Sequence, residues 1–524
     1  MATLCKFNDL TPEQTGQIIN LLTLQPVDPS QEERKKFKYA APVRYTSIPD
    51  PVLMYQLSED KQAILIPFRF GCSLLGRMVN QDRPHIKAID SKNSTSFVAT
   101  LRENQVEDAI ASLNYLTVYG STTIGLPPGR GKTMLGMWLW YLMKYVGLIY
   151  THREIIADQW WKTIEKSIPE ILSWVWYVGK NGPPTAGFCP AVIICVDGRY
   201  DHIPQYIKDA VGTLIIDEAH LFCTPCRAPQ PAKDGKPQST GCLMAIRPRY
   251  IIIETATLER PNQMHAMMQA IAGTHGVYKI SEVPYYVICV DTNIKVDESK
   301  TSRGVSYVEL CKSFAVSSER NGIILDIVRT NQHRKFMIQT RLKTHASLME
   351  QMFKLCEMKC GTLYGKQNAY YDSPILIGTM PKMGTGMDEE NLCQDYSGAR
   401  SDTLILAHSV KQWQLYEQLR GRVMRCEAPI VIWLRDKNAM SRRHFKDLEE
   451  WITKTKGVIV NVTYRPGGIV LPAAPQSTTS AVTAMPLRIT DLRCSLLPGQ
   501  IEEQQIAETR AFISSIPQLP VIKT

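Results

Sequence analysis

The chain has 524 residues, of which 44% are hydrophobic and 21% are charged, and its formal net charge is +10. This length exceeds one ordinary domain, the apolar content is enough for sizeable cores, and the positive charge is compatible with a polyanionic partner without requiring one. Its 14 cysteines would indicate disulfides in a secreted chain. The N-terminus has no basic segment followed by an apolar core, so we expect an intracellular protein with free thiols that is not secreted.

The first 97 residues combine Pro-rich, irregular segments with one clear strand, at residues 63–67. They contain no catalytic constellation, which predicts a small N-terminal accessory domain over residues 1–97. A helix is expected over residues 106–116, and Gln105 stands at its entry. A glutamine there can offer both a donor and an acceptor to an adenine edge, although a surface glutamine is usually solvated.

A glycine-containing loop follows, which reads Leu-Pro-Pro-Gly-Arg-Gly-Lys-Thr from Leu126 to Thr133. It stands between a strand expected over residues 118–124 and a helix. A strand that turns into a helix through glycines can close its backbone N–H groups around phosphate oxygens, aided by the helix N-terminus. Lys132 would neutralise the β- and γ-phosphates of a nucleoside triphosphate, and Thr133 would bind Mg²⁺.

Short aliphatic runs recur after the loop at the spacing of an α/β sheet, at residues 147–150, 191–196, 213–216 and 250–253. Strands of this kind are buried on both faces, as in a parallel sheet. The third run ends in Asp217-Glu218-Ala219-His220, at a strand end that shares its crevice with the phosphate loop. Asp217 would hold Mg²⁺ and Glu218 would polarise the attacking water, whereas the alternative is a solvated acidic turn.

A second set of runs follows a change of composition near residues 285–325 and lies at residues 335–339, 374–379, 403–407 and 430–434. It predicts a second α/β domain of similar size without a phosphate loop. Two segments carry chemistry, Gly384 to Asp388 after a strand and Gln418 to Arg425 at the end of a helix. Arg422 and Arg425 are three apart and are expected on one helix face. They would stabilise a transferring γ-phosphoryl group, unless they form an ordinary solvated surface.

The end of the chain differs in composition from the rest. From about residue 467 it is rich in Gly, Pro, Ala, Ser and Thr, which predicts a flexible linker, and a short helix is expected over residues 500–514. The expected units are therefore residues 1–97, 98–285, 286–466 and 467–524. The most apolar stretch, residues 134–150, is interrupted by Lys144 and is interpreted as a buried helix and strand, not a membrane span.

Two further groups of residues have competing interpretations. Cys223 and Cys226 with Cys242 could form a partial zinc site, but no fourth ligand is evident, and the alternative is a Pro-rich loop with free cysteines. A set of tryptophans could stack on bases, although packing beside the sheet is favoured for Trp138, Trp140, Trp160 and Trp161.

In this order, the motifs resemble those of the superfamily 2 helicases over residues 98–460. Each is modest alone, and the resemblance rests on the ordered set: Gln105, Leu126 to Thr133, Thr151-His152-Arg153 with Gln159-Trp160, Asp217-Glu218-Ala219-His220 (DEAH), Thr255-Ala256-Thr257, Gly378-Thr379 with Gly384 to Asp388, and Gln418 to Arg425. The general phosphate-loop pattern has glycine at the position of Leu126. Here Gly125 stands one residue earlier, a departure that favours the helicase form.

Within the superfamily, the chain resembles the double-strand-directed group of XPB-like, phage UvsW-like and poxvirus transcript-release helicases. The resemblance rests on three features: the strand ending in Ile66-Pro67, the Leu-Arg-x-x-Gln sequence from Leu101 to Gln105 at the start of a helix, and the pair Gln159-Trp160. The compact length of the chain and the segment Ser318-Glu319-Arg320-Asn321, at the entry to the second domain, are similar to those of the helicases carried by large DNA viruses. A viral protein would act at the replication site of the host cell or in the virion.

The resemblance implies an α/β fold with two tandem RecA-like domains built on parallel sheets, plus the accessory domain and the tail. It also implies ATP and Mg²⁺ as cofactors, with Thr133 and Asp217 at the metal. The residues implied in nucleotide binding are Gln105, Pro128, Gly129, Arg130, Gly131, Lys132, Thr133 and Asp388. Catalytic roles are implied for Lys132, Asp217, Glu218, Gln418, Arg422 and Arg425, and coupling roles for His220, Thr255 and Thr257.

The function implied by the resemblance is a nucleic-acid-dependent ATPase that translocates on or unwinds DNA. DNA is favoured over RNA, the transcription or replication machinery is a further candidate partner, and no membrane partner is expected. ATP that contacts both lobes would favour a closed cleft, and hydrolysis would remove those contacts. The alternative is an ATP-gated clamp or remodelling factor without processive unwinding, which the motifs do not distinguish from a motor.

Overall fold

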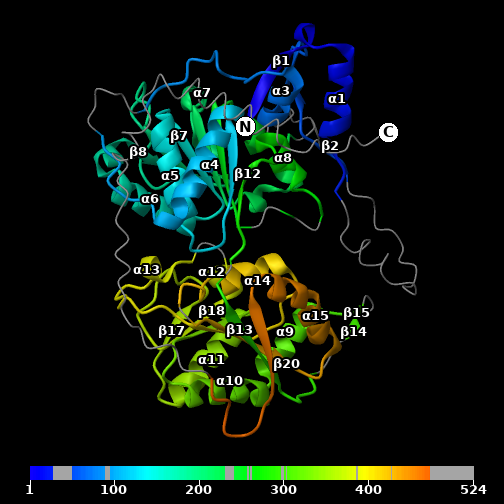
Figure 1. The fold of residues 1–524 in the computed structure, drawn as a ribbon, viewed down its shortest axis with the longest axis vertical. Helices are drawn as coiled ribbons and strands as arrows, with labels where there is room; N and C mark the ends of the chain where they lie inside the picture. Colours follow the sequence, from blue (N-terminus) through cyan, green and yellow to red (C-terminus); the bar gives the residue numbers. More distant parts are fainter. Residues whose placement is uncertain are drawn as a thin grey trace.

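The computed structural model describes residues 1–26, 50–58, 60–88, 95–229, 241–256, 259, 262–281, 283–296, 300–301, 304–384, 387–426 and 428–471. The helix expected over residues 500–514 and most of the expected tail lie outside these residues. Figure 1 shows two α/β lobes stacked along the long axis, with the N-terminal unit beside the first lobe.

The first lobe is built on a seven-stranded sheet whose paired strands are all parallel. Along the sheet, the strands are β12 (Gly276–Tyr278), β6 (Ser121–Gly125), β11 (Tyr250–Glu254), β10 (Thr213–Asp217), β7 (Gly147–Thr151), β9 (Val192–Val196) and β8 (Val175–Tyr177). Its α-helices are α4 (Glu103–Tyr119), α5 (Lys132–Met143), α6 (Glu154–Ser167), α7 (Gln205–Ala210) and α8 (Ala266–Ala272). The short 3₁₀ helices are η2 (Pro169–Trp174), η3 (Tyr200–His202), η4 (Ala219–Phe222), η5 (Pro225–Arg227) and η6 (Cys242–Met244).

The second lobe repeats this plan with another seven-stranded parallel sheet. Its strands are β17 (Cys360–Leu363), β18 (Ile375–Thr379), β16 (Phe336–Thr340), β19 (Thr403–Leu406), β20 (Ile430–Arg435), β13 (Tyr285–Asp291) and β21 (Gly457–Thr463). Its helices are α9 (Tyr307–Val316), α10 (Ser318–Thr330), α11 (Lys343–Leu355), α12 (Met380–Met383), α13 (Glu389–Leu392), α14 (Trp413–Arg420) and α15 (Ala439–Lys454). A small antiparallel pair is formed by β14 (Lys300–Thr301) and β15 (Gly304–Val305).

The expected fold class, two tandem RecA-like domains with parallel sheets, is confirmed by these two sheets. The expected apolar runs all form strands of them, because buried aliphatic segments need neighbours on both faces. The strand expected over residues 118–124 begins later, at Ser121, since α4 continues to Tyr119 and ends at Gly120 with a φ of 69°. Within the described residues, no helix combines the length and apolar character needed to cross a bilayer.

The N-terminal unit is attached tightly to the first lobe. Its three-stranded antiparallel sheet has the order β1 (Ala2–Lys6), β5 (Ala63–Pro67) and β4 (Gln56–Leu57). Its other elements are η1 (Phe7–Asp9), α1 (Pro12–Leu22), the pair β2 (Thr23–Leu24) and β3 (Val52–Leu53), and α3 (Phe68–Leu75). One hydrophobic core runs from Ile64 and Phe68 of this unit to Leu148 and Leu214 of the first sheet. The unit therefore shares its core with the first lobe.

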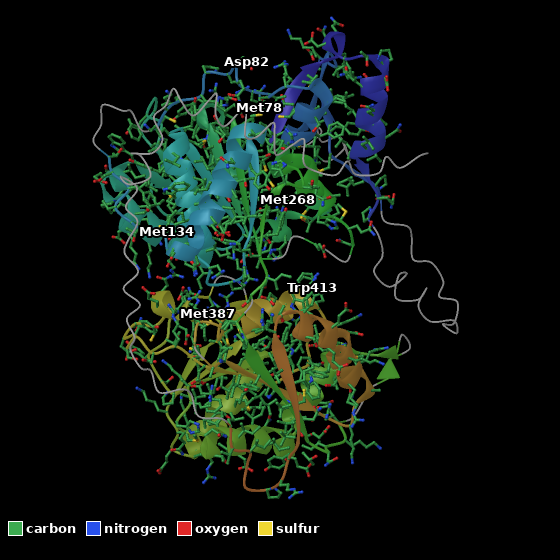
Figure 2. The ribbon with its side chains drawn as sticks, viewed as in Figure 1. Met78, Asp82, Met134, Met268, Met387 and Trp413 are labelled. Carbon is green, nitrogen blue, oxygen red and sulfur yellow. The ribbon has the colours of Figure 1, made fainter. Side chains whose placement is uncertain are left out.

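The two lobes meet where the carboxyl ends of their strands face each other. Arg153 of the first lobe donates to the carbonyl of Pro381, and Lys162 Nζ donates to the carbonyl of Asn391 at 3.1 Å. Met134 and Met387 line the space between the lobes from opposite sides (Figure 2). The segments after β6, β10, β18 and α14 all border this space.

The contact between the N-terminal unit and α4 gives a test of the shared core. Gly120 adopts a φ of +69°, and a Cβ there would clash with the Met78 methyl and lie 2.8 Å from Phe68 Cζ. Gly76 is a matched control, because its φ is +62° and a Cβ would meet no atom within 4 Å. Gly76→Ala should cost about 1–2 kcal/mol for the left-handed backbone, and Gly120→Ala about 1–3 kcal/mol more for the clash. Thermal unfolding measures both, and equal losses would contradict the shared interface.

Candidate active site

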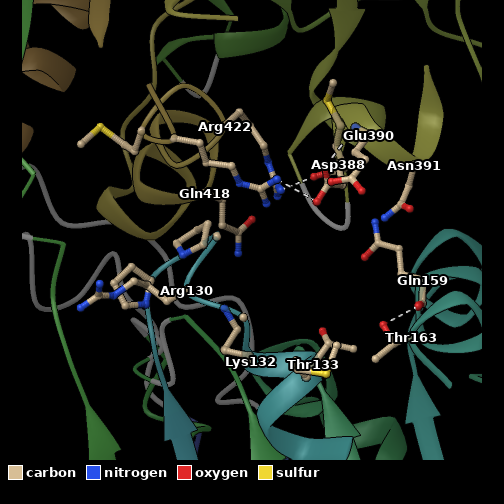
Figure 3. A pocket seen from close by; sticks show the side chains of 18 of the residues that line it. Arg130, Lys132, Thr133, Gln159, Thr163, Asp388, Glu390, Asn391, Gln418 and Arg422 are labelled. Carbon is tan, nitrogen blue, oxygen red and sulfur yellow. Dashed lines mark hydrogen bonds and ion pairs between the residues drawn. The ribbon is translucent and has the colours of Figure 1, made fainter. Parts of the chain in front are cut away.

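A cleft of about 630 Å³ lies between the lobes and is lined by residues of both. The first lobe contributes the phosphate loop with Asp217 and Glu218, and the second contributes Asp388, Gln418, Arg422 and Arg425. Figure 3 shows Lys132 and Thr133 on one side, facing Gln418 and Arg422 on the other. Most of the site residues expected from the sequence are therefore brought together in one place, with Gln105 the main departure.

The phosphate loop has the backbone that its glycines allow. Gly129 and Gly131 have φ angles of +83° and +77°, which side-chain-bearing residues rarely adopt, and α5 begins at Lys132. Lys132 Nζ donates to the carbonyl of Leu126 at 2.9 Å, so its ammonium lies over the loop. Leu126 is fully buried, which explains how the loop accepts leucine at this position. Free backbone donors, a lysine and a helix N-terminus are the chemistry that a triphosphate requires.

The two adjacent carboxylates have different environments. Asp217 is buried, and its oxygens accept hydrogen bonds from the Glu218 N–H at 2.7 Å and from Trp160 Nε1 at 2.8 Å. Burial and then the negative charge of Glu218 raise the pKa of Asp217 to about 6. Glu218 has a φ of 50°, a left-handed conformation that residues with a side chain rarely adopt, and it lines the cleft. Asp217 is thus fixed in orientation, while Glu218 faces the space between the lobes.

His220 connects the lobes through its two ring nitrogens. Gln418 Nε2 of α14 lies 3.1 Å from His220 Nε2, and His220 Nδ1 lies 3.1 Å from Thr255 Oγ1. If the amide donates, the imidazole carries its hydrogen on Nδ1 and donates it to Thr255. The expected coupling residues His220, Thr255 and Gln418 are therefore in one hydrogen-bonded chain. Thr257 lies outside the described residues.

The two arginines of the second lobe do not share a helix face, because α14 ends at Arg420 and both follow it in a series of turns. Arg422 donates to the carbonyls of Met387 and, at 2.7 Å, Gly384. Desolvation and then the charge of Arg425 lower the pKa of Arg422 to about 10, so it remains protonated at neutral pH. Its guanidinium is used to support the segment that carries Asp388.

Arg425 instead crosses the cleft. Its Nη1 donates to Asp388 Oδ2 at 2.7 Å, and its Nε lies 2.8 Å from the point where a Cβ of Gly129 would stand. Burial alone would raise the pKa of Asp388, but the charge and hydrogen bonds of Arg425, with those of Arg400, hold it below its usual value. Arg425 is therefore the charge that the second lobe presents to the phosphate loop.

Gln105 is engaged by the backbone at both ends of its amide. Its Oε1 accepts from the Arg102 N–H at 2.9 Å, and its Nε2 donates to the Gly131 carbonyl at 3.0 Å. It does not line the cleft, whereas Arg102 does and donates to the Gly129 carbonyl at 3.2 Å. An adenine contact by Gln105 would require these bonds to open. In this structure its role is to join the start of α4 to the phosphate loop.

Sequence reasoning missed Glu254, the last residue of β11. It is fully buried in register with Asp217, and neither carboxyl oxygen has a hydrogen-bond partner within the described residues. Burial, followed by the negative charge of Asp217, raises its pKa well above the usual value. A carboxyl residue at the end of an aliphatic run, before Thr255, was the signal available in the sequence. Trp160 was favoured for packing beside the sheet and was included in a helicase motif, and in the structure it also orients Asp217.

The structure also places the cysteines and the tryptophans that the sequence analysis singled out. Cys223 and Cys242 are buried and Cys226 is exposed, and among the described residues no group of three or more His, Cys, Asp or Glu side chains could hold a metal ion. Trp138, Trp140 and Trp160 are buried in the core of the first lobe, as the favoured interpretation expects.

Comparisons with known proteins give the following similarities. No protein-family model matches the chain. "Putative helicase 161L" of Invertebrate iridescent virus 6 is 25% identical over 468 residues, which cover 84% of this chain and 98% of that protein. "Uncharacterized protein 108L" of Invertebrate iridescent virus 3 is 36% identical over 98 residues, which cover 18% of this chain and 78% of that protein. The solved structure of S. cerevisiae Dbp5 bound to RNA and ADP BeF3 is 10% identical, with a TM-score of 0.47, and covers 68% of this chain and 89% of that one.

The unpaired carboxyl of Glu254 gives a prediction for stability. Because its pKa is raised in the folded chain, the native state retains a proton that the unfolded state has lost, and stability falls as the pH rises through the folded pKa. Glu254→Gln removes this titration. We expect it to be more stable than the wild type at alkaline pH, with a difference that grows as the pH rises toward the folded pKa of Glu254.

Thermal unfolding from pH 5 to 9 checks this expectation, with Glu107→Gln as the control because Glu107 is exposed on the same lobe. Parallel profiles for the wild type and Glu254→Gln would show that Glu254 does not hold a proton in the folded chain.

Proposed function

We infer that this chain, which belongs to one family with the iridovirus protein 108L, is an ATP-hydrolysing motor of the superfamily 2 helicase type. The observation that carries this proposal is the position of Arg425, which extends from the second lobe to Gly129 of the phosphate loop. A cleft with a lysine and two carboxylates on one lobe and an arginine on the other suits phosphoryl transfer that depends on closure.

The residues of the cleft fit a magnesium nucleoside triphosphate. The loop from Pro128 to Thr133 would bind the phosphates through its N–H groups and Lys132. Thr133 and Asp217 would hold Mg²⁺, and a bound Mg²⁺ would supply charge neutralisation at the β- and γ-phosphates. Asp217 is well suited because the Trp160 and Glu218 N–H groups already fix its orientation.

Glu218 is the group proposed to act on the attacking water. Its Oε2 is buried and makes no hydrogen bond within the described residues, although His220 Nδ1 lies at 3.3 Å. An oxygen held next to the phosphate loop with a free lone pair can accept a proton from water and orient it for in-line attack. Arg425 would stabilise the charge that develops on the transferring phosphoryl group.

The chain from Gln418 through His220 to Thr255 supplies a route for coupling. His220 is two residues after Glu218, and its Nδ1 lies 3.3 Å from Glu218 Oε2, so a change at Glu218 would alter a hydrogen bond that reaches α14 of the other lobe. Thr255 follows Glu254 at the end of β11, beside the strand that ends in Asp217. Loss of the γ-phosphate would remove the contacts that favour closure, and the lobes would separate.

Nucleic acid is the proposed partner, with DNA favoured over RNA and a DEAH-type, double-strand-directed action. The support is the ordered set of motifs, the net charge of +10, and the names of relatives such as "Putative helicase 161L". A second candidate is an ATP-gated clamp, which the closed contact between Arg153 and Pro381 also favours. Strand displacement beside triplex displacement distinguishes unwinding from translocation, and a clamp would show neither.

The direct test of the proposal is ATP hydrolysis by the purified chain, alone and with single- or double-stranded DNA or RNA. We expect stimulation by nucleic acid and loss of hydrolysis in Lys132→Ala, because this change removes the ammonium above the phosphate loop. The expected loss is at least about 100-fold in kcat, on the scale of removing an electrostatic contact made to the transition state. Wild-type turnover by Lys132→Ala would contradict the site.

A second test separates Glu218 from Arg425. Glu218→Gln keeps the size of the side chain but loses the charge that activates water, so ATP should bind and the closed form should accumulate. Arg425→Ala removes a group contributed by the second lobe, so ATP should bind the first lobe while closure and hydrolysis both fail. Energy transfer between dyes on the exposed thiols Cys226 and Cys356 reports closure. If both variants close, or neither does, Arg425 does not act across the cleft.

A further inference from the structure

The carboxylate of Asp388 is shared by two arginines of the second lobe. Its Oδ2 accepts from Arg425 Nη1 at 2.7 Å, and its Oδ1 accepts from Arg400 Nη1 at 3.0 Å. The three side chains are each about one-fifth exposed, so the cluster is largely shielded from water. Each arginine therefore holds one oxygen, and Asp388 makes a single hydrogen bond with Arg425. Oδ1 also accepts from the Glu390 N–H at 3.1 Å, as the N-cap of α13.

Arg400 is held in place by its own surroundings. The next residue, Ser401, donates its Oγ to Glu389 Oε1 at 2.7 Å and its N–H to both Glu389 oxygens, and both residues are buried. Arg400 Nη2 donates to Glu390 Oε2 at 3.2 Å, and its guanidinium lies 5.6 Å from the Tyr396 ring centroid. The segment that bears Arg400 is thus anchored to α13, directly after Asp388.

The same lobe contains an aspartate whose carboxylate is hydrogen-bonded by one arginine within the described residues, although the charge of Arg442 also acts on it. Arg435 binds Asp291 through two hydrogen bonds, from Nε at 2.7 Å and from Nη2 at 2.6 Å. This bidentate geometry is the one that an arginine and a carboxylate prefer. Asp388 differs because Arg400 already occupies one of its oxygens. As a result, the Nε of Arg425 is buried without a hydrogen-bond partner within the described residues, and it lies next to Gly129.

The cluster also reaches the first lobe. Glu390, which accepts from Arg400, lies 3.3 Å from Lys166 Nζ of α6. Figure 3 shows Asp388 and Glu390 side by side on the second-lobe side of the cleft. Arg400 therefore bridges a carboxylate that faces Arg425 and a carboxylate that touches the other lobe.

We propose that Arg400 is a positioning residue for Arg425: by holding one oxygen of Asp388, it keeps Asp388 from binding Arg425 bidentately and leaves the remaining donors of Arg425 directed at the phosphate loop. This inference rests on the proposed function, because it assigns a residue to the hydrolysis reaction. Arg400 acts through Asp388 and contacts no phosphate in this role.

Removal of Arg400 would take away the charged donor to Oδ1 of Asp388 and leave the Glu390 N–H, at 3.1 Å, as the remaining donor to that oxygen within the described residues. The carboxylate would then turn to bind Arg425 through both oxygens, as Asp291 binds Arg435, and would neutralise and withdraw it. Because ATP binding depends on the phosphate loop, we expect Arg400→Ala to lower kcat by about 10- to 100-fold with less than about a threefold change in KM. This is part of the 10³–10⁵-fold contribution of an arginine finger. Arg400→Lys, which keeps one donor for Oδ1, should recover most of the rate.

Steady-state hydrolysis by the full chain, with saturating nucleic acid, measures these values. Arg435→Ala is the matched control, because Arg435 is equally exposed, pairs with an aspartate of the same lobe and does not line the cleft. It should retain the wild-type kcat. The decisive comparison is made in the Asp388→Asn background, where Arg400→Ala should have no further effect on kcat. Thermal unfolding of every variant separates a loss of rate from a loss of fold.

The outcomes distinguish this inference from the proposed function. Three results, each obtained with an active wild type, would overturn the role of Arg400 alone. The first is an unchanged kcat in Arg400→Ala, and the second is a change confined to KM. The third is a loss of kcat from Arg400→Ala that multiplies with the loss from Asp388→Asn. The last of these results would mean that Arg400 touches the nucleotide directly. A wild type without ATP hydrolysis would overturn the proposed function itself. If Arg400→Ala does not fold, the comparison of Arg400→Lys with the wild type decides, because Lys must retain most of the rate.

Discussion

Buried carboxyl groups are the constraint on which the cleft depends. Asp217, Glu218 and Glu254 lie together at the carboxyl ends of β10 and β11, and the pKa values of Asp217 and Glu254 are raised by desolvation and then by the negative charge of a neighbouring carboxylate. Lys132 is a cation of the first lobe whose charge lowers the pKa of both Asp217 and Glu254. Buried carboxyl groups of this kind are unfavourable by themselves, so the first lobe holds them at the expense of its own stability. In the proposed function, a divalent cation bound at Asp217 would offset this cost.

The second lobe instead places several arginine side chains, and hence several positive charges, beside the cleft. Arg400, Arg422 and Arg425 stand close together, and each is held by an acceptor of the same lobe: Asp388 for two of them and backbone carbonyls for the third. These bonds hold the positive charges in place, and in this structure Arg425 already lies next to Gly129 of the phosphate loop. In the proposed mechanism, its charge would meet a bound phosphate without a large rearrangement of its neighbours.

The amino-acid sequence predicts the sheets, the phosphate loop and the carboxylates because each depends on local pattern: aliphatic runs, glycines and a strand end. It could not predict that Glu254 lies beside Asp217, since this contact follows from the order of strands β10 and β11 in the sheet. Arg400 has no motif around it, and its contact with Asp388 depends on the buried bond of Ser401 to Glu389. The helix face expected for Arg422 and Arg425 was wrong because α14 ends at Arg420, where the chain turns tightly.

Gln418 and Arg425 contact different parts of the first lobe. Gln418 is on α14 and contacts His220, which is hydrogen-bonded to Thr255. Arg425 lies in the turns that follow this helix, is held by Asp388 and lies next to Gly129 of the phosphate loop. Because both residues belong to one short segment of the chain, a movement of α14 that alters the contact with His220 would also move the turns that carry Arg425. The proposed coupling between the lobes would therefore run through this single segment.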